Sequence, residues 1–213
     1  MKVAIYSESP ADEAALRILV DALRGEATEP AHLPCRLASR GVESVFNLLS
    51  TVIRALHYNS NAEALVVVVD SNHTPIDPAE PNTDGARAKR CRLTRLREIV
   101  EQVTPTLKPV ADRPALRVAL GLAVPAIEAW YLCGHESGIS EEAWAQGLAA
   151  GKEPYSKARL KQLAYGTDRP SLAIETERAV EHARRVAAGL GLLDAKFPVG
   201  FGSFARDVRN WGA

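Results

Sequence analysis

The sequence predicts an α/β protein built on a mostly parallel sheet that is flanked by helices. Two observations carry this prediction: short apolar runs of strand length, and longer amphipathic segments that alternate with them. In addition, the apolar runs over 2–6 and 64–69 each lead to an acidic residue, Glu8 and Asp70. Because the carboxyl ends of parallel strands border the ligand crevice of an open sheet, we expect both acids at one edge.

The first half of the chain alternates strands and helices. Apolar residues recur every three or four positions in the expected helices, and turn-forming residues separate the elements. The expected elements are a strand before Glu8, a helix over 11–24 stopped by Gly25, a short strand over 35–39, a helix over 42–56, a strand ending at Asp70 and a loop over 71–86. This order is typical of a doubly wound sheet.

The second half is mostly helical. The same periodicity predicts one more strand and several short helices. They are a helix over 89–103, a strand over 116–124 stopped by Pro125, a short helix over 126–133, helices over 141–149, 156–165 and 176–188, a glycine-rich bend and a last helix over 203–209. We expect residues 1–134 to form the α/β domain and residues 135–213 a helical extension packed on it.

Composition excludes several classes of protein. Lys plus Arg and Asp plus Glu both number 26 among the 213 residues, so any nucleic-acid binding needs a local basic patch. The 3 cysteines lack metal-ligand spacing and cannot all pair, which favours reduced thiols. No signal peptide or membrane-length apolar run is present, so we expect a cytoplasmic protein that does not contact a membrane.

The two strand-end acids favour a hard cation such as magnesium. Asp and Glu are also common helix caps and turn formers, and Glu8 precedes an expected helix. For either residue alone, the capping role and the ligand role have about equal weight.

Longer motifs add a resemblance. The chain resembles a TOPRIM-related bacterial family of unknown function that is often associated with defence genes. The resemblance covers most of the chain and rests on Glu8, the helix over 11–24, Asp70-Ser71-Asn72, Pro125-Ala126-Ile127-Glu128-Ala129-Trp130 and Gly202-Ser203-Phe204. It implies a TOPRIM-like fold in which a Glu and an Asp-x-Asp pair hold magnesium and act on phosphodiesters.

The resemblance implies a set of metal ligands: Glu8, Asp70 and Asn72, holding magnesium or, alternatively, manganese. Two positions depart from the family pattern. Asn72 stands where the second Asp is expected, and Ser9 stands where a Gly usually follows the first Glu. An amide oxygen supplies a dipole in place of a full charge, so we expect weaker binding of the cation.

Two residues are candidates for acid-base chemistry. Glu8 is either a metal ligand or a general base. Glu128 is a second acid, base or ligand, because the turn after 116–124 brings it to the same sheet edge. Helix capping or pairing with a core arginine explains Glu128 equally well. Trp130 fits the core better than a base-stacking platform.

A basic run supplies the candidate nucleic-acid contacts. Residues 87–97 contain six Lys or Arg side chains and no acid. We assign nucleic-acid binding to Arg87, Lys89, Arg90 and Arg92, with Arg206 and Arg209 as further members if the fold brings them near. An amphipathic surface helix is the simpler explanation of the same pattern.

Two hypotheses follow. The first is a magnesium-dependent, nuclease-like enzyme that acts on nucleic-acid phosphodiesters in a bacterial defence or DNA-processing system, where a protein encoded nearby is a possible partner. The second is a non-catalytic module of the same fold that binds nucleic acid, a nucleotide or a partner protein. A Rossmann-type enzyme is disfavoured because the glycine fingerprint is missing.

Overall fold

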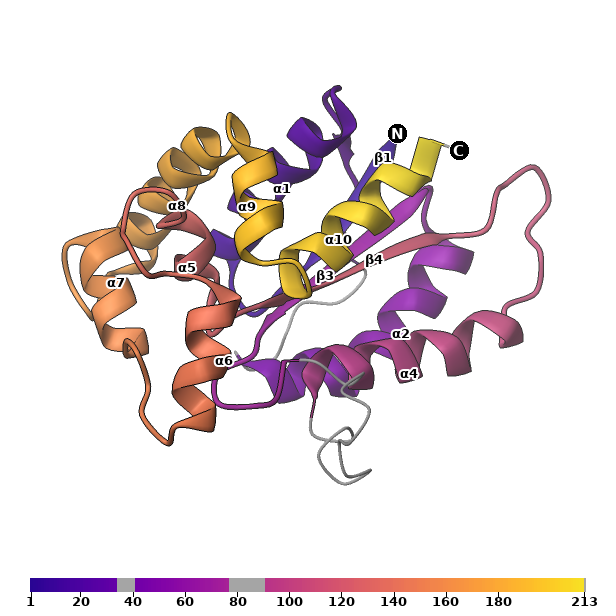
Figure 1. Cartoon of the computed structure of the whole chain (residues 1–213). Helices are drawn as coiled ribbons and strands as arrows, with labels where there is room; N and C mark the ends of the chain where they lie inside the picture. Colours follow the sequence, from indigo (N-terminus) through magenta and orange to yellow (C-terminus); the bar gives the residue numbers. More distant parts are fainter. Residues whose placement is uncertain (34–40, 77–90, 213) are drawn as a thin grey trace.

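The computed structural model describes residues 1–33, 41–76 and 91–212 (Figure 1). Within these residues the centre is a four-stranded, all-parallel sheet with the strand order β2-β1-β3-β4. The strands are β1 (Lys2–Tyr6), β2 (Glu29–Pro30), β3 (Ala64–Asp70) and β4 (Arg117–Ala123). The predicted α/β class with a parallel sheet is confirmed.

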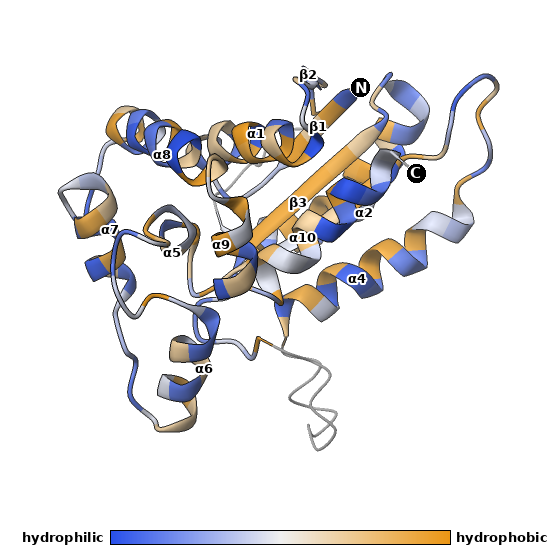
Figure 2. Cartoon of the chain, turned by 45° about the horizontal axis from the view of Figure 1, so that its top comes forward, coloured by the Kyte–Doolittle hydropathy of each residue, from blue (hydrophilic) through white to orange (hydrophobic). Residues whose placement is uncertain are grey.

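Strand β3 is the apolar centre of the sheet. It lies between β1 and β4, and its residues from Ala64 to Val69 are buried. A strand covered on both faces needs a continuous apolar run, and Figure 2 shows hydrophobic colour along β3. At the edge, β2 is only two residues long and contains Pro30. A proline is tolerated there because an edge strand can leave one side of its backbone unpaired.

Helices cover both faces of the sheet (Figure 1). On one face α2 (Val42–Asn59) packs on β3, and α4 (Arg92–Val103) packs on α2 and β4. On the other face α1 (Pro10–Arg24) contacts β1, α10 (Gly200–Arg209) contacts β4, and α8 (Leu172–Ala187) packs along α1. Gly25 ends α1 in the left-handed region, at φ 71°, as its position after the amphipathic segment predicts.

Three short helices gather beside the carboxyl ends of the strands (Figure 1). They are α5 (Ile127–Tyr131), α6 (Glu141–Ala149) and α7 (Lys157–Tyr165), and α7 contacts both α5 and α8. The remaining elements are α9 (Leu190–Lys196) and the 3₁₀ turns η1 (Thr104–Thr106) and η2 (Asn210–Gly212). Residues that follow β1, β3 and β4 therefore meet residues from the second half of the chain.

Three details differ from the sequence prediction. The expected strand over 35–39 lies outside the described residues, whereas β2 forms in the proline-containing stretch before it. Helix α8 begins at Leu172, four residues early, because the Ser171 hydroxyl accepts the Ile174 N–H and caps it. The expected glycine-rich bend contains α9 and the start of α10. A Cβ on Gly200 would lie 1.9 Å from the Leu122 carbonyl oxygen, so close packing explains this glycine.

None of the described helices has the length and apolar character that a membrane crossing requires.

Candidate functional site

Glu8 and Asp70 meet at the carboxyl edge of the sheet. Strands β1 and β3 are parallel neighbours, so the residues just beyond them share this edge. The Asp70 backbone N–H donates a hydrogen bond to Glu8 Oε1 at 2.9 Å, although 62 positions separate the two residues. Burial, and then the adjacent Asp70, raise the pKa of the Glu8 carboxyl. Two predicted site residues are therefore neighbours.

The Asp70 carboxylate contacts two other elements. Its Oδ1 accepts the backbone N–H of Ile127 at 3.0 Å, at the start of α5. Its Oδ2 accepts a hydrogen bond from Lys157 Nζ, at the start of α7, and the two side chains form an ion pair. Asp70 thus combines the capping role and the charged role that the sequence left open.

Asn72 lies beside this pair. Its φ of 50° is in the left-handed region, which Asn tolerates better than most residues, and its N–H donates to the Pro125 carbonyl at 2.8 Å. The amide oxygen faces Lys157 Nζ at 3.4 Å in one orientation and Arg92 Nη1 at 2.7 Å after an amide flip. The shorter contact favours Arg92. Asn72 is thus near the acids, and two cations surround it.

Glu128 is the most unusual acid of the cluster. It lies in the first turn of α5 and is only 3% exposed. Lys161 Nζ lies 3.7 Å from Oε1, and Oε2 has no hydrogen-bond partner among the described residues. Burial, and then the charge of Asp70, raise the pKa of Glu128 to about 7. A buried carboxylate oxygen without a partner is costly, which points to a use beyond folding.

Sequence reasoning missed three members of the cluster. Asp12, in the first turn of α1, has a pKa well above its usual range because of burial and the charges of Asp70 and Glu128. Burial lowers the pKa of Lys157, but Asp70 and Glu128 outweigh this and raise it. Lys161 pairs with Glu175 at 2.8 Å as well as with Glu128. The spacing of Lys157 and Lys161, one helical turn apart, was the available signal.

The basic run is only partly described. Arg87, Lys89 and Arg90 lie outside the described residues. Arg92 faces the acid cluster, where its guanidinium donates to the Asp70 carbonyl. Arg95 bonds to Glu43 at 3.0 Å on the outer surface of α4. Of the four residues assigned in this run, Arg92 alone lies within the described residues, and it adjoins the cluster.

The C-terminal helix adds an arginine to this side of the molecule. Arg97 Nη2 from α4 and Arg206 Nη2 from α10 both donate to the buried Ser203 hydroxyl, each at 3.2 Å. The predicted extension of the basic run toward the C-terminus therefore has a structural basis at Arg206. Arg209 bonds instead to Asp194 at 2.9 Å.

Trp130 belongs to the core, as expected. It is fully buried, and its ring packs edge-on against Phe201 at 5.2 Å between centroids. His73 is exposed and lies 3.1 Å from Glu153. No described contact places Trp130 or His73 in the acid cluster.

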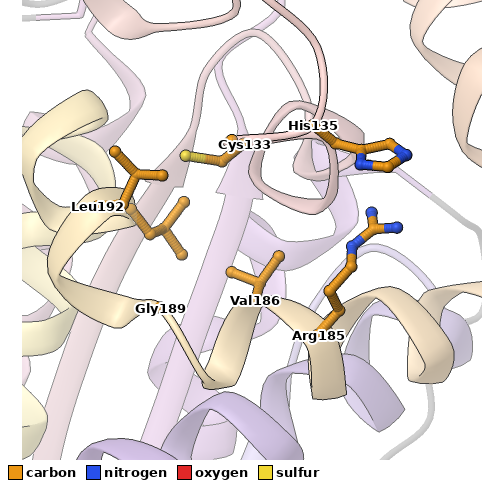
Figure 3. A pocket seen from close by; sticks show the side chains of 8 residues that line it. Cys133, His135, Arg185, Val186, Gly189 and Leu192 are labelled. Carbon is orange, nitrogen blue, oxygen red and sulfur yellow. The ribbon is translucent and has the colours of Figure 1, made fainter.

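A cavity of about 190 Å³ lies elsewhere in the molecule (Figure 3). The residues that line it are Cys133, Gly134, His135, Arg185, Val186, Gly189, Leu192 and Leu193. Arg185 already donates to the Tyr131 carbonyl at 2.9 Å and contacts His182 Nδ1 at 2.7 Å. Burial raises the pKa of the Cys133 thiol, which disfavours a nucleophilic thiolate. The acid cluster is therefore the stronger candidate site.

Comparison with protein-family models, curated proteins and solved structures gives no match for this chain. Within the described ranges, no group of three or more His, Cys, Asp or Glu side chains is arranged as a metal-binding set. The chemistry of the acid cluster is therefore the feature of this molecule that indicates a function.

Proposed function

We propose that this chain is a TOPRIM-like enzyme that hydrolyses nucleic-acid phosphodiesters with a divalent cation. The observation that supports it best is the contact of Glu8 with Asp70 beside the buried, unpartnered oxygen of Glu128. Acids held so close repel one another, and burial adds to the cost of their charge. A bound cation would remove much of this cost.

The chemistry of the donors suits magnesium or manganese. Glu8, Asp70 and Asn72 offer carboxylate and amide oxygens, which hard cations prefer, and these residues would hold the ion. The raised pKa values of Glu8 and Glu128, caused by burial and then by Asp70, fit a site whose acids lack sufficient positive charge. When bound, the cation would neutralise charge that develops on the phosphate oxygens.

Protein side chains account for the remaining chemistry. Glu128 is the proposed general acid or base, because its carboxyl group is buried beside Asp70 and its Oε2 has no hydrogen-bond partner among the described residues. Arg92 can use its remaining donors for a phosphate, because a guanidinium carries five N–H groups. Arg97 and Arg206 would contact phosphates farther along the bound nucleic-acid strand.

A cleavage assay tests this proposal. Labelled single-stranded and duplex DNA and RNA would be incubated with magnesium or manganese, and with a chelator. We expect metal-dependent cleavage that Glu8→Ala and Asp70→Ala abolish. Glu177→Gln is the matched control, since it removes an exposed acid from α8. Cleavage that survives both site substitutions would contradict the proposed active site.

The second candidate is the non-catalytic module that binds nucleic acid. One observation favours it: Lys157 already pairs with Asp70, so part of the acid charge is balanced without a metal. This function predicts binding of labelled nucleic acid in the presence of a chelator and no cleavage under any metal condition. Fluorescence anisotropy on the same substrates separates the two candidates.

We also propose that the protein is cytoplasmic. Cys91 and Cys133, the cysteines in the described ranges, are both free thiols, which fits a reducing compartment.

A further inference from the structure

We infer that Lys157 is a built-in counter-cation of the acid cluster, and that a divalent cation binds Asp70 only by displacing it. This inference deepens the proposed function, on which it rests, by naming the residue that sets cation affinity. The carrying observation is the hydrogen-bonded ion pair between Lys157 Nζ and Asp70 Oδ2. An ammonium group therefore occupies the open side of a proposed metal ligand.

The charges around Lys157 explain why it is held there. Asp70, Glu128 and Glu8 all stabilise its ammonium form. The other two cations of the cluster have additional fixed partners. Arg92 is bonded to the Asp70 carbonyl, and Lys161 to Glu175 at 2.8 Å. Lys157 is thus the cation that bonds the Asp70 carboxylate itself, whereas Arg92 bonds the Asp70 backbone carbonyl.

The position of Lys157 also allows it to leave. Its side chain is 42% exposed, whereas that of Lys161 is 25% exposed. Lys157 is the first residue of α7, and the Ser156 hydroxyl caps this helix by accepting the Arg159 N–H at 3.1 Å. Rotation of the flexible lysine side chain into solvent leaves that cap intact. Exchange of ammonium for a metal ion therefore requires no rearrangement of the fold.

Competition has a direct consequence for affinity. Two cations cannot share the same oxygen of Asp70, so each lowers the occupancy of the other. Loss of Lys157 should raise the affinity for magnesium or manganese. Attraction between unit charges at ion-pair distance is strong, so we expect the affinity for the divalent cation to rise by at least about tenfold.

Calorimetric titration of magnesium and manganese into the full chain tests the inference. The variants are Lys157→Gln, which removes the ammonium, and Lys157→Arg, which keeps a cation. Arg159→Gln is the matched control, because it removes one positive charge from an exposed position on the same helix. Circular dichroism would verify that each variant is folded.

The expected result is a dissociation constant at least about tenfold lower for Lys157→Gln, with Arg159→Gln and Lys157→Arg near wild type. If Lys157→Gln and Arg159→Gln gained cation affinity equally, the change in net charge would explain the effect and the inference would be overturned. Unchanged affinity, or no cation binding by Lys157→Gln, would also overturn it. Since the readout is binding, absence of cleavage would refute the proposed function separately.

Discussion

Two buried glutamates on neighbouring short helices have opposite surroundings. Glu128 in α5 is 3% exposed and Glu141 in α6 is 4% exposed. Glu141 accepts the Gly200 N–H at 2.6 Å and the Val199 N–H at 2.8 Å, one on each oxygen. Glu128 has Lys161 3.7 Å from one oxygen, and its other oxygen has no hydrogen-bond partner in the described part of the chain.

The difference separates a structural acid from a candidate functional one. Glu141 satisfies backbone donors at the start of α10, where unpaired N–H groups and the helix dipole favour an acid. Its burial is therefore explained by the fold. Glu128 makes no comparable pair of backbone bonds and leaves Oε2 without a hydrogen-bond partner in the described part of the chain, which makes this oxygen the candidate contact for a cation, a substrate or a proton.

The largest expected effect is on catalysis. Glu128→Gln keeps the shape of the side chain but removes its proton chemistry. We expect the cleavage rate to fall by about 10²- to 10⁴-fold. Glu141→Gln should retain the cleavage rate under conditions where the protein is folded. Single-turnover assays at one metal concentration measure both, and an unchanged rate in Glu128→Gln would remove Glu128 from the mechanism.

Stability should respond in the opposite way. Glu141→Gln turns an amide NH₂ toward one of two backbone donors, so we expect a loss of about 2–3 kcal/mol in the free energy of unfolding. Glu128→Gln should be neutral or stabilising, because it removes a poorly compensated buried charge. Urea unfolding followed by circular dichroism compares the pair. Similar losses of unfolding free energy in Glu141→Gln and Glu128→Gln would contradict the different roles assigned to the two glutamates.

The pH dependence of stability sharpens the same contrast. Burial and then Asp70 raise the pKa of Glu128 from 4.5 to about 7 in the folded protein. The folded state therefore holds this proton more tightly than the unfolded chain. Its stabilising contribution is complete below pH 4.5 and is lost as the pH rises to about 7. We expect Glu128 to contribute a loss of about 3 kcal/mol over this range, since one pKa unit corresponds to about 1.4 kcal/mol.

Urea unfolding at several pH values measures this contribution as the difference between wild type and Glu128→Gln. The Gln side chain does not titrate here, so the decline should be shallower in the variant. Parallel curves for the two proteins would show that the raised pKa of Glu128 has no consequence for folding.

The sequence predicted the sheet-edge acids because they depend on a local pattern. A buried run that ends in an acid is visible in one segment, and parallel strands bring such ends together, as Glu8 and Asp70 illustrate. Most helices were predicted for the same reason. The start of α8 was missed because the Ser171 cap overrode composition there, and α9 was missed because glycines at its start are typical of a bend.

The cations of the cluster depend on tertiary packing, which no local pattern contains. Lys157 bonds to Asp70, which lies 87 positions earlier in the sequence. The sequence of its helix is typical of an exposed surface helix and does not indicate this contact. Asp12 was hidden for a different reason, because an acid in the first turn of a helix is common. Glu128 was found only through the resemblance and its place after a strand, and its missing hydrogen bond required the structure.

The smallest expected effect concerns Asn72. Asn72→Asp adds a carboxylate to the acid cluster around Glu128, whose charge is poorly compensated. Magnesium binding should therefore tighten by roughly threefold to tenfold. Without metal, repulsion among the acids should cost no more than about 1 kcal/mol of stability. Calorimetry and urea unfolding measure the two changes. Weaker magnesium binding by the variant would show that Asn72 does not face the ion.

Diffraction from crystals of the wild type and of Lys157→Gln, soaked in manganese, tests the central claim most directly. Anomalous scattering locates manganese independently of any activity. We predict a peak in contact with the carboxylates of Glu8 and Asp70, with higher occupancy in Lys157→Gln and with Lys157 turned away from Asp70 in the wild type. The absence of a peak at these carboxylates in both proteins at saturating manganese would contradict the account.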